Sequence, residues 1–595
     1  MDVSDIMAFK PSQAPKRPAG NDVSLASDET IDDPSDNYEA RAKKRKLAVL
    51  RAKAIAAKAE DEARIRQMEQ EAMESKLKRN HNEAVGDQMM KIAQLVDQGE
   101  NFHHVVLDSP GVKRLLLSFE KKTLKNQELR IKFPDDPERF LESELELHDS
   151  LRELHSLATV PEQYPVLVNL GCVPSLLGLL SHANTDIAVA AVELLEEMTD
   201  VDTLDESSDG AEALVENLLD NQVLSLLASN LARLDETVRE ESEGVHNTLA
   251  IIEHILEFRP DTCKQVATAG FLPWIVRKLK VKVVYDSNKL YASEILSILL
   301  QDCSENRELF GEIGAMDSLL QQLAYYKRHD PAVAEEVELM ENLFVCLCCL
   351  LAETENRRKF LTGEGLQLMN LMLREKKKSR GGALKVLSHA LSGSGGGRLC
   401  RKFVEILGLR TIFPLFMKTP SRGRRAGVSG EEHEEHVINI LASLFRNIKA
   451  GNDENVRNGG GSGGMKERLL CKFVENDHEK VDRLVELHCE YLVRLVETDK
   501  VLREEALKLE GTEEEVEEEM YIKRLEGGLF PLQQLDYMIL YICRNGADSI
   551  RHRVEQGLKL RGETLSTVKE VVKRWEQSME GEEADIQELL SLSEA

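Results

Sequence analysis

The amino-acid sequence predicts an all-α protein in which short helical repeats stack into a superhelix. The chain has 595 residues, more than one hydrophobic core usually organises, so several domains or a repeat array are expected. Only 16 prolines and 5% aromatic residues occur, and Leu, Glu, Ala and Lys are frequent, which favours helices over sheets. A block of similar form also recurs along the chain at nearly regular intervals, which is typical of repeat architectures.

The N-terminal segment before the repeats predicts no packed domain. Residues 1–38 mix Pro, Ser, Asp and Gly with few large apolar side chains, a composition typical of a disordered tail. Residues 39–104 form a charged arm. Up to Arg79 this arm is rich in Ala, Lys, Glu and Arg and contains no Pro or Gly, so it permits a long polar helix.

A basic cluster inside this arm is a candidate nuclear-localisation signal. Eight basic residues and no acidic residue lie between Arg41 and Lys58. The candidate comprises Lys43, Lys44, Arg45 and Lys46, with an earlier pair, Lys16 and Arg17, that is flanked by prolines. A solvated helix face or a weak RNA-binding arm is the alternative, because short basic runs are common.

The central part of the chain predicts an array of repeats behind a helical cap. Residues 105–165 are expected to form the cap, and residues 166–450 about six repeats. In each block a glycine precedes a short Leu-rich helix, and a polar turn leads into a longer apolar helix. The blocks begin at Gly171, Gly270, Gly314, Gly365 and Gly408, and a further unit without its glycine begins at Gln222.

The spacing of these blocks identifies their type. The glycines from Gly270 to Gly408 lie 44, 51 and 43 residues apart, close to the period of about 40–47 residues of armadillo and HEAT repeats. Each unit has an apolar face that it cannot bury alone, so stacked units share one continuous core. The sequence therefore predicts an α-solenoid with a concave surface, in which each glycine permits a sharp turn.

Beyond the repeats, residues 451–464 predict a Gly-rich linker, and residues 465–595 predict a helical C-terminal domain that seals the last repeat. The regular block is lost there, and helices of other lengths are expected. These helices cover Met465–Glu475, Glu479–Leu509, Glu515–Arg544 and Ser549–Glu580.

The charge of the chain suits basic partners. The formal net charge is −28, and residues 1–80 contain 16 Lys or Arg against 15 Asp or Glu, which leaves −29 for the remainder. Such a charge opposes a phosphate backbone, so direct nucleic-acid binding is not expected. No apolar stretch reaches membrane-spanning length, no signal peptide is evident, and the ten scattered cysteines are typical of reduced thiols. Cytosol or nucleus is expected.

No motif predicts catalysis, so we expect neither an enzyme nor a bound metal or cofactor. In the run His433–His436 the two histidines are three apart, whereas zinc proteases place them four apart. A solvated helix start is therefore favoured over a metal site. The glycine-rich runs Gly393–Gly397 and Gly459–Gly464 lack the Lys-Ser/Thr of a phosphate loop and are interpreted as linkers.

The last helix of each repeat is expected to line the concave groove, with exposed positions four apart. Alignment of the Leu positions places six pairs there: Glu193/Glu197, Ala250/His254, Glu294/Ile298, Asn342/Cys346, Lys385/His389 and Asn439/Ser443. With the nearby Glu338, the first four repeats are acidic and suit Lys/Arg-rich partners, whereas Lys385 breaks the pattern. The predicted partner-binding residues are Glu193, Glu197, His254, Glu294, Glu338, Asn342, His389 and Asn439.

Two alternatives to this groove are open. The charges could be ordinary solvated helix residues, because exposed Glu is common on helices. A nuclear transport adaptor related in architecture to importin-α is the second alternative. No pair supplies the Trp and Asn that importin-α uses to clasp basic peptides, and the two tryptophans, Trp274 and Trp575, lie elsewhere.

Several longer stretches closely resemble the beta-catenin-like protein 1 family. They are Lys125–Phe140, Gly244–Ala250, Gly363–Glu375, Leu407–Lys418 and Asn476–His488. The resemblance implies a nuclear, spliceosome-associated protein with armadillo repeats, which acts in pre-mRNA splicing. It also implies self-association, attachment to the complex of the Prp19 ubiquitin ligase and its Myb-type partner, and recognition of basic, localisation-signal-like segments of splicing factors. The Ala/Lys/Arg-rich arm and the Gly-rich insertion depart from the family pattern.

Overall fold

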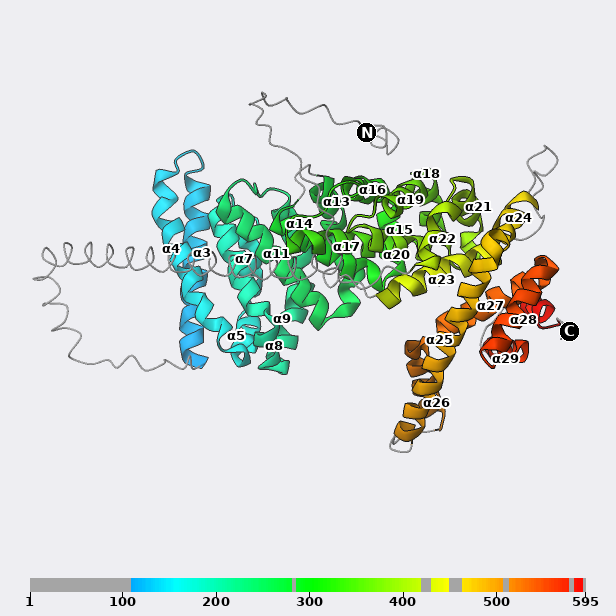
Figure 1. The fold of residues 1–595 in the computed structure, drawn as a ribbon. Helices are drawn as coiled ribbons and strands as arrows, with labels where there is room; N and C mark the ends of the chain where they lie inside the picture. Colours follow the sequence, from blue (N-terminus) through cyan, green and yellow to red (C-terminus); the bar gives the residue numbers. More distant parts are fainter. Residues whose placement is uncertain are drawn as a thin grey trace, which may run out of the picture. The chain divides into compact units, whose positions relative to one another are not determined.

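The computed structural model describes residues 109–280, 285–418, 430–448, 463–506, 513–576 and 583–591. These residues form helices and contain no strand, which confirms the predicted all-α class (Figure 1). The N-terminal tail, the basic arm with its nuclear-localisation candidate, and nearly all of the Gly-rich linker lie outside the described residues. None of the helices described is long and apolar enough to cross a membrane.

Two long helices, α3 (Ser109–Lys132) and α4 (Glu138–Ala158), precede the repeats. They run antiparallel, because Asn126 Nδ2 donates to Ser143 Oγ at 3.0 Å while Lys125 reaches Glu146 at 2.6 Å. Helix α4 also packs on the next long helix, α7 (Thr185–Thr199). The pair therefore covers the apolar face that the first repeat would otherwise expose.

A unit of three helices follows six times within the described residues. The first helices of the units are α5 (Tyr164–Asn169), α9 (Ser208–Asp220), α12 (Cys263–Val266), α15 (Ser304–Glu312), α18 (Thr354–Thr362) and α21 (Gly397–Glu405). The second helices are α6 (Val173–Leu179), α10 (Val223–Leu231), α13 (Leu272–Lys280), α16 (Ala315–Tyr325), α19 (Gly365–Glu375) and α22 (Leu409–Met417). The third helices are α7, α11 (Arg239–Phe258), α14 (Ser287–Gln301), α17 (Ala334–Leu350), α20 (Arg380–Leu391) and α23 (Gly430–Asn447).

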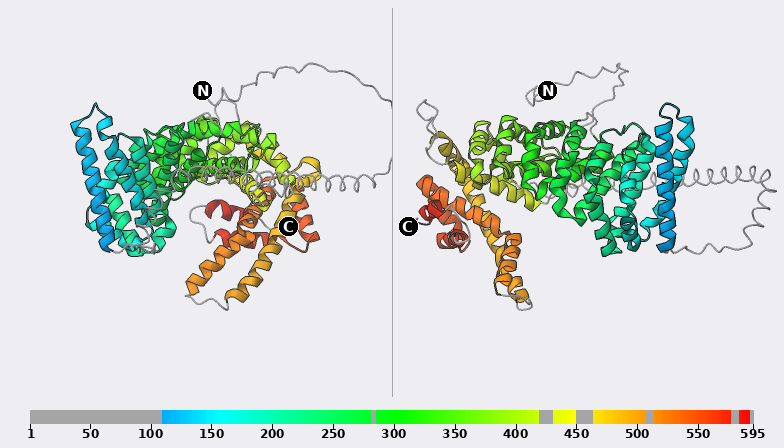
Figure 2. Two further views of the ribbon diagram at one scale, coloured as in Figure 1. Left: turned by 90° about the vertical axis from the view of Figure 1, so that its left-hand side faces the viewer. Right: turned by 180° about the vertical axis from the view of Figure 1, so that it is seen from behind.

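The third helices form a continuous row. Each one packs on the next, from α4 through α7, α11, α14, α17 and α20 to α23, and Figure 2 shows these helices following one another in chain order. Leu195, Ile252 and Leu296 are among their fully buried side chains. Since every unit covers the apolar face of its neighbour, one core runs through the whole row.

A residue in the left-handed conformation precedes each second helix. Its φ is 71° at Gly171, 61° at Gln222, 121° at Gly270, 71° at Gly314, 58° at Glu364 and 64° at Leu407. The predicted turning role is thus correct for Gly171, Gly270 and Gly314. It is wrong for Gly365 and Gly408, where the chain turns one residue earlier. These two glycines are required instead because a Cβ would lie 2.2 Å from the Phe360 ring or 2.5 Å from the Phe403 ring.

Substitution of Gly365 by alanine tests this packing role. We expect Gly365→Ala to lower the free energy of unfolding by about 1–3 kcal/mol, because the added methyl group overpacks the site against Phe360. Gly178→Ala is the matched control, since a Cβ there meets no atom within 4 Å. Chemical denaturation of both variants checks the prediction, and equal effects on stability would contradict it.

The C-terminal helices are α24 (Gly463–Cys471), α25 (Glu475–Ala506), α26 (Glu513–Arg524), α27 (Phe530–Asn545), α28 (Asp548–Leu560), α29 (Leu565–Glu576) and α30 (Glu583–Leu590). Helix α27 is buried around most of its circumference and packs on α23, α25 and α29. The helices predicted over Glu515–Arg544 and Ser549–Glu580 are each split in two. Gly528, with φ 99°, ends the first near its middle, and Gly562, with φ 83°, separates α28 from α29.

Candidate protein-binding face

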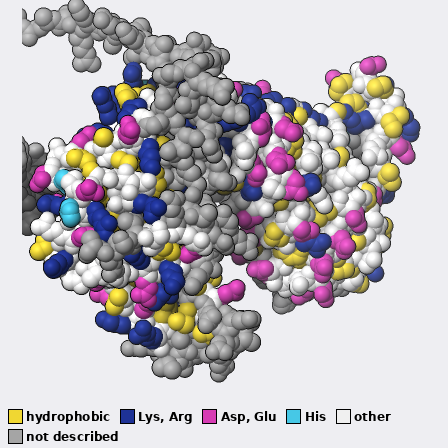
Figure 3. Space-filling view, turned by 90° about the vertical axis from the view of Figure 1, so that its right-hand side faces the viewer, with side chains coloured by type: hydrophobic (Ala, Val, Ile, Leu, Met, Phe, Trp, Pro, Cys, Tyr) yellow, Lys and Arg dark blue, Asp and Glu magenta, His cyan; other side chains and the backbone are white. Residues whose placement is uncertain are grey.

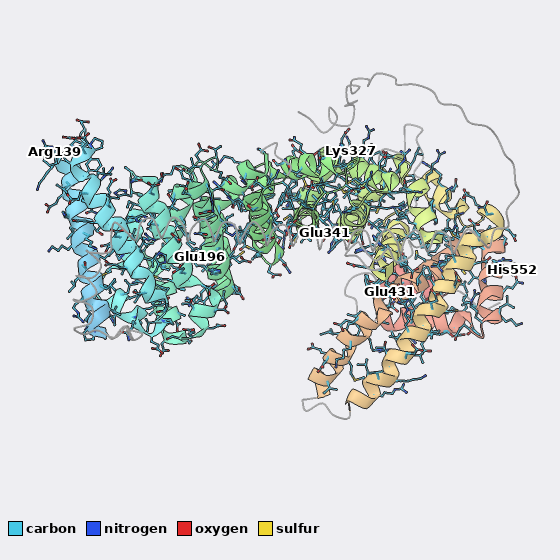
Figure 4. The ribbon with its side chains drawn as sticks, turned by 60° about the vertical axis from the view of Figure 1, so that its left-hand side comes forward. Arg139, Glu196, Lys327, Glu341, Glu431 and His552 are labelled. Atoms are coloured by element: carbon cyan, nitrogen blue, oxygen red, sulfur yellow. The ribbon has the colours of Figure 1, made fainter. Side chains whose placement is uncertain are left out.

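The third helices of the first four repeats carry a run of carboxylates. We call Glu196 on α7, Glu253 on α11, Glu294 on α14 and Glu338 on α17 the acidic ladder. The apolar spacing of each helix fixes this orientation. In α14, for example, Ile295 and Leu296 are fully buried against neighbouring units, which leaves Glu294 half-buried beside them. Figure 4 labels Glu196 and also Glu341, which lies one helical turn from Glu338 on α17.

A tyrosine joins the middle of the acidic ladder. Tyr291 on α14 donates its hydroxyl to Glu253 Oε2 on α11 at 2.5 Å. Burial raises the pKa of Tyr291, and the hydrogen bond to Glu253 and the nearby charges of Glu294 and Glu196 raise it further. Three members of the ladder therefore surround one side chain. Their electric fields overlap across three consecutive repeats.

The carboxylates of the ladder repel one another. Burial raises the pKa of Glu294 above its ordinary value, and the charges of Glu338 and Glu253 add to the effect. Burial also raises the pKa of Glu196, together with Asp200, Glu197 and Glu193. None of the four ladder residues forms a salt bridge with another described residue. A cation bound at this face would relieve that repulsion.

The structure places the predicted acidic residues in different surroundings. Glu193 is exposed one turn from the ladder. Glu197 is engaged by the cap, because His155 Nδ1 on α4 lies 2.6 Å from its Oε2. His254 is half-buried, and burial lowers its pKa below the ordinary value. Glu294 and Glu338 belong to the ladder itself.

The two asparagines predicted to bind a partner instead form hydrogen bonds between neighbouring repeats. Asn342 Nδ2 donates to Ser293 Oγ at 3.2 Å, and Asn439 Nδ2 donates to Ser388 Oγ at 2.7 Å. Each of these hydrogen bonds joins neighbouring third helices. Both amide groups therefore orient helices, although the sequence pattern predicted that they contact a partner.

The predicted register is shifted on α17. By their burial, Val345 and Cys349 occupy the positions that Glu294 and Ile298 occupy on α14, whereas Cys346 is fully buried. The prediction was three residues too early because the run from Leu343 to Leu351 is apolar almost throughout and offers no unique alignment. Ala250 and Ser443, which were also expected in the groove, are buried.

Sequence reasoning missed Glu196 and Glu253. Both lie three residues after a predicted position, Glu193 or Ala250, and the prediction used a spacing of four. Residues three and four apart share one face of a helix, so a search with both spacings would have found them.

The predicted solvated start of α23 also differs. His433 and His436 are half-buried, and burial lowers the pKa of His436 to about 4, with His389, Lys385 and His433 contributing. Among the residues that the structure describes, no group of three or more His, Cys, Asp and Glu side chains is arranged to hold a metal ion.

The concentration of acidic side chains along the ladder differs from the charge distribution on another face of the molecule. Figure 3, which views the side where the C-terminal helices lie in Figure 1, shows acidic and basic side chains interspersed in small groups. The ladder instead concentrates one sign of charge along successive repeats. A stack of three-helix units with such a face defines an armadillo-type protein-binding scaffold.

Comparison with known proteins gives the family. The chain belongs to the family described as "Catenin-beta-like, Arm-motif containing nuclear", whose model matches residues 90–573. It is 53% identical over 477 residues to beta-catenin-like protein 1 of Rattus norvegicus, covering 80% of this chain and 82% of that protein. It is 33% identical over 434 residues to the beta-catenin-like protein 1 homolog of Schizosaccharomyces pombe, covering 73% and 72%.

One engineered protein of known structure is similar over 79% of this chain and 97% of its own. Its TM-score is 0.42 and its sequence identity 15%.

Proposed function

We propose that this protein is a non-catalytic scaffold of the nucleus that binds basic, localisation-signal-like segments of splicing factors. Its place would be in pre-mRNA splicing, with the Prp19-associated complex and its Myb-type component as partners. The observation that carries the proposal is the acidic ladder, whose four carboxylates lie on successive repeats without a described cationic partner. The family description, which includes the word nuclear, supports the proposed compartment.

The geometry explains how a basic segment would bind. An extended chain laid along the row of third helices meets one ladder carboxylate after another. Lys and Arg side chains would donate charge-assisted hydrogen bonds to them, which are stronger than neutral ones. Since Glu196, Glu253 and Glu294 are half-buried, salt would screen these contacts less than exposed pairs. The energy of binding comes in part from ending the repulsion between the carboxylates.

Charge reversal at the two ends of the ladder tests the proposal. We expect Glu196→Lys/Glu338→Lys to weaken binding of a fluorescent Lys/Arg-rich peptide at least about tenfold, because two attractive charges become repulsive. These positions leave the bond between Tyr291 and Glu253 intact. Fluorescence anisotropy measures the dissociation constant.

The matched control is Glu216→Lys/Glu308→Lys, which makes the same change in net charge at exposed positions of the first helices α9 and α15. We expect this variant to bind nearly as tightly as the wild type. Equal weakening of peptide binding in both variants would mean that only the net charge of the protein matters. That result would exclude the ladder as the binding site.

We propose in addition that α3 mediates self-association. Leu117, Leu124 and Ile131 are 63%, 57% and 81% exposed and lie seven residues apart, which places them in one stripe along the helix. A heptad stripe of this kind suits a facing helix from a second copy.

Light scattering after gel filtration tests this stripe. We expect the wild type to form an oligomer at micromolar concentration, and Leu124→Glu/Ile131→Glu to be monomeric, because charge opposes burial of the stripe. Val493→Glu/Leu560→Glu, which makes the same kind of change at positions that are 58% and 80% exposed on α25 and α28, is the control and should leave the oligomer intact. A monomeric wild type would refute the proposal.

A further inference from the structure

The run His433-Glu-Glu-His436 at the start of α23 faces two neighbouring helices, α25 and α20. Glu434 faces α25, where its Oε2 accepts from Arg483 Nη2 at 2.9 Å and its Oε1 accepts from the Tyr491 hydroxyl at 3.3 Å. Glu431 lies 3.6 Å from Arg494 on the same helix. The acidic side of this run is therefore occupied by the C-terminal domain.

The histidine side of the run faces α20. Asn439, one turn after His436, hydrogen-bonds to Ser388, which immediately precedes His389. This contact places His436 and His389 at the seam between α20 and α23. Lys385 lies one turn before His389 on α20. We call Lys385, His389 and His436 the cationic subsite.

The subsite lacks a described anion. Among the described residues, Lys385 forms no salt bridge, and the buried His436 Nε2 has no hydrogen-bond partner. Burial first, and then the charges of His389 and Lys385, lower the pKa of His436 to about 4. His436 is therefore neutral at neutral pH, and Lys385 supplies the positive charge of the subsite. A buried nitrogen without a partner is destabilising, and an anion next to it would reverse that effect.

The position of the subsite connects it with the ladder. The ladder ends at Glu338 on α17, and α20 is the next third helix in the row. A Cβ at Gly382 would meet the Phe344 ring, so these two residues are level with each other on α20 and α17. Lys385 therefore lies near Cys348, which is ten residues, or roughly 15 Å of helix, beyond Glu338. With about 10 Å between neighbouring packed helices, the separation is roughly 18 Å, which about five or six residues of an extended chain would span. One bound segment can therefore reach both features.

We propose that the cationic subsite binds a phosphate group, carried as phosphoserine or phosphothreonine by the same segment whose Lys and Arg side chains lie on the acidic ladder. This inference rests on the proposed function, and it adds phosphorylation of the partner as a means of regulating that binding. A phosphate dianion has three acceptor oxygens and matches several donors, whereas a carboxylate carries one charge. The phosphates of a nucleic acid are disfavoured because the adjoining ladder would repel the rest of its backbone.

A series of peptides tests the subsite. Each peptide has a Lys/Arg block and, on one side of it, a spacer of two to six Gly or Ser residues. The spacer ends in phosphoserine, serine or glutamate. Binding to the full-length chain is measured by fluorescence anisotropy. We expect phosphoserine at one spacing or more to bind roughly tenfold more tightly than serine, and glutamate to give a smaller gain. In Lys385→Ala/His389→Ala we expect the gain to vanish, while the serine peptide binds as it does to the wild type.

The matched control is Lys113→Ala/His552→Ala, which removes one exposed lysine and one exposed histidine from α3 and α28. It should retain the full gain. The proposal is overturned if no spacing gives a gain, if the gain persists in Lys385→Ala/His389→Ala, or if a single-stranded oligonucleotide binds with the same dependence on Lys385.

If the proposed function is wrong, the peptides are expected to give a different result. In that case the serine peptide would not bind at all. Binding of the phosphoserine peptide that still requires Lys385 and His389 would then support the subsite without the ladder, and no binding of either peptide would overturn both.

Discussion

Replacing Asp536 with alanine is expected to lower the free energy of unfolding of the C-terminal domain by about 3–5 kcal/mol. Asp536 Oδ1 on α27 lies 2.5 Å from His488 Nδ1 on α25, and both side chains are 0% exposed. Neither His488 Nε2 nor Asp536 Oδ2 has a hydrogen-bond partner among the described residues, so no second contact there compensates for the loss. The variant would leave a buried imidazole with its polar atoms unpaired.

A double substitution separates this pair from simple loss of packing. We expect His488→Leu/Asp536→Leu to be much less destabilising than Asp536→Ala, because two apolar side chains need no hydrogen bond. Urea denaturation followed by circular dichroism gives both values. If the double variant lost as much stability as the single one, the hydrogen-bonded pair would not be the source of the effect.

The same pair predicts how stability depends on pH. Burial alone would lower the pKa of His488, but the charge of Asp536 and their hydrogen bond raise it on balance above 6.5. Burial also raises the pKa of Asp536. Both shifts mean that the folded domain binds protons more tightly, so stability falls as pH rises. The contribution of His488 is present below pH 6.5 and is lost as pH rises through its raised pKa, and the double variant should lack this loss.

Replacing Phe473 with alanine is expected to cost about 3–5 kcal/mol of stability and to loosen the contact between the C-terminal domain and the last repeat. The Phe473 ring is 0% exposed, and its centroid lies 5.6 Å from that of Phe413 and 5.7 Å from that of Phe445. Those two rings belong to α22 and α23. Phe473 therefore joins the start of the C-terminal domain to both helices.

Two measurements distinguish a local loosening from general unfolding. Limited proteolysis of Phe473→Ala should cut between the repeats and the C-terminal helices faster than in the wild type. Phe530→Ala, at a position that is 43% exposed, is the control and should change neither the melting temperature nor the cleavage rate appreciably. A Phe473→Ala protein with unchanged cleavage would contradict the assigned role.

The sequence predicted the array but not all of its details, for physical reasons. Leu spacing identified the second and third helices because burial of one face requires that spacing. It could not place α17, whose apolar run permits several registers. It also assigned Gly408 to a turn, because a glycine that turns the chain and one that admits the Phe403 ring look alike in a sequence. The pairing of His155 with Glu197 depends on how the cap meets α7, which local patterns do not encode.

The contacts of Arg446 can form only after nearly the whole chain has been synthesised. This residue of α23 donates to Gln534 at 3.0 Å, and its guanidinium lies 4.5 Å from the centre of the Trp575 ring. Among the described residues, earlier repeats pack mainly on their neighbours, and such units can fold as they leave the ribosome. The side of α23 that carries Arg446 is covered only after the chain has been extended past Trp575. A nascent chain that terminates early would therefore present the unfinished edge of α23, a surface that chaperones and proteases recognise.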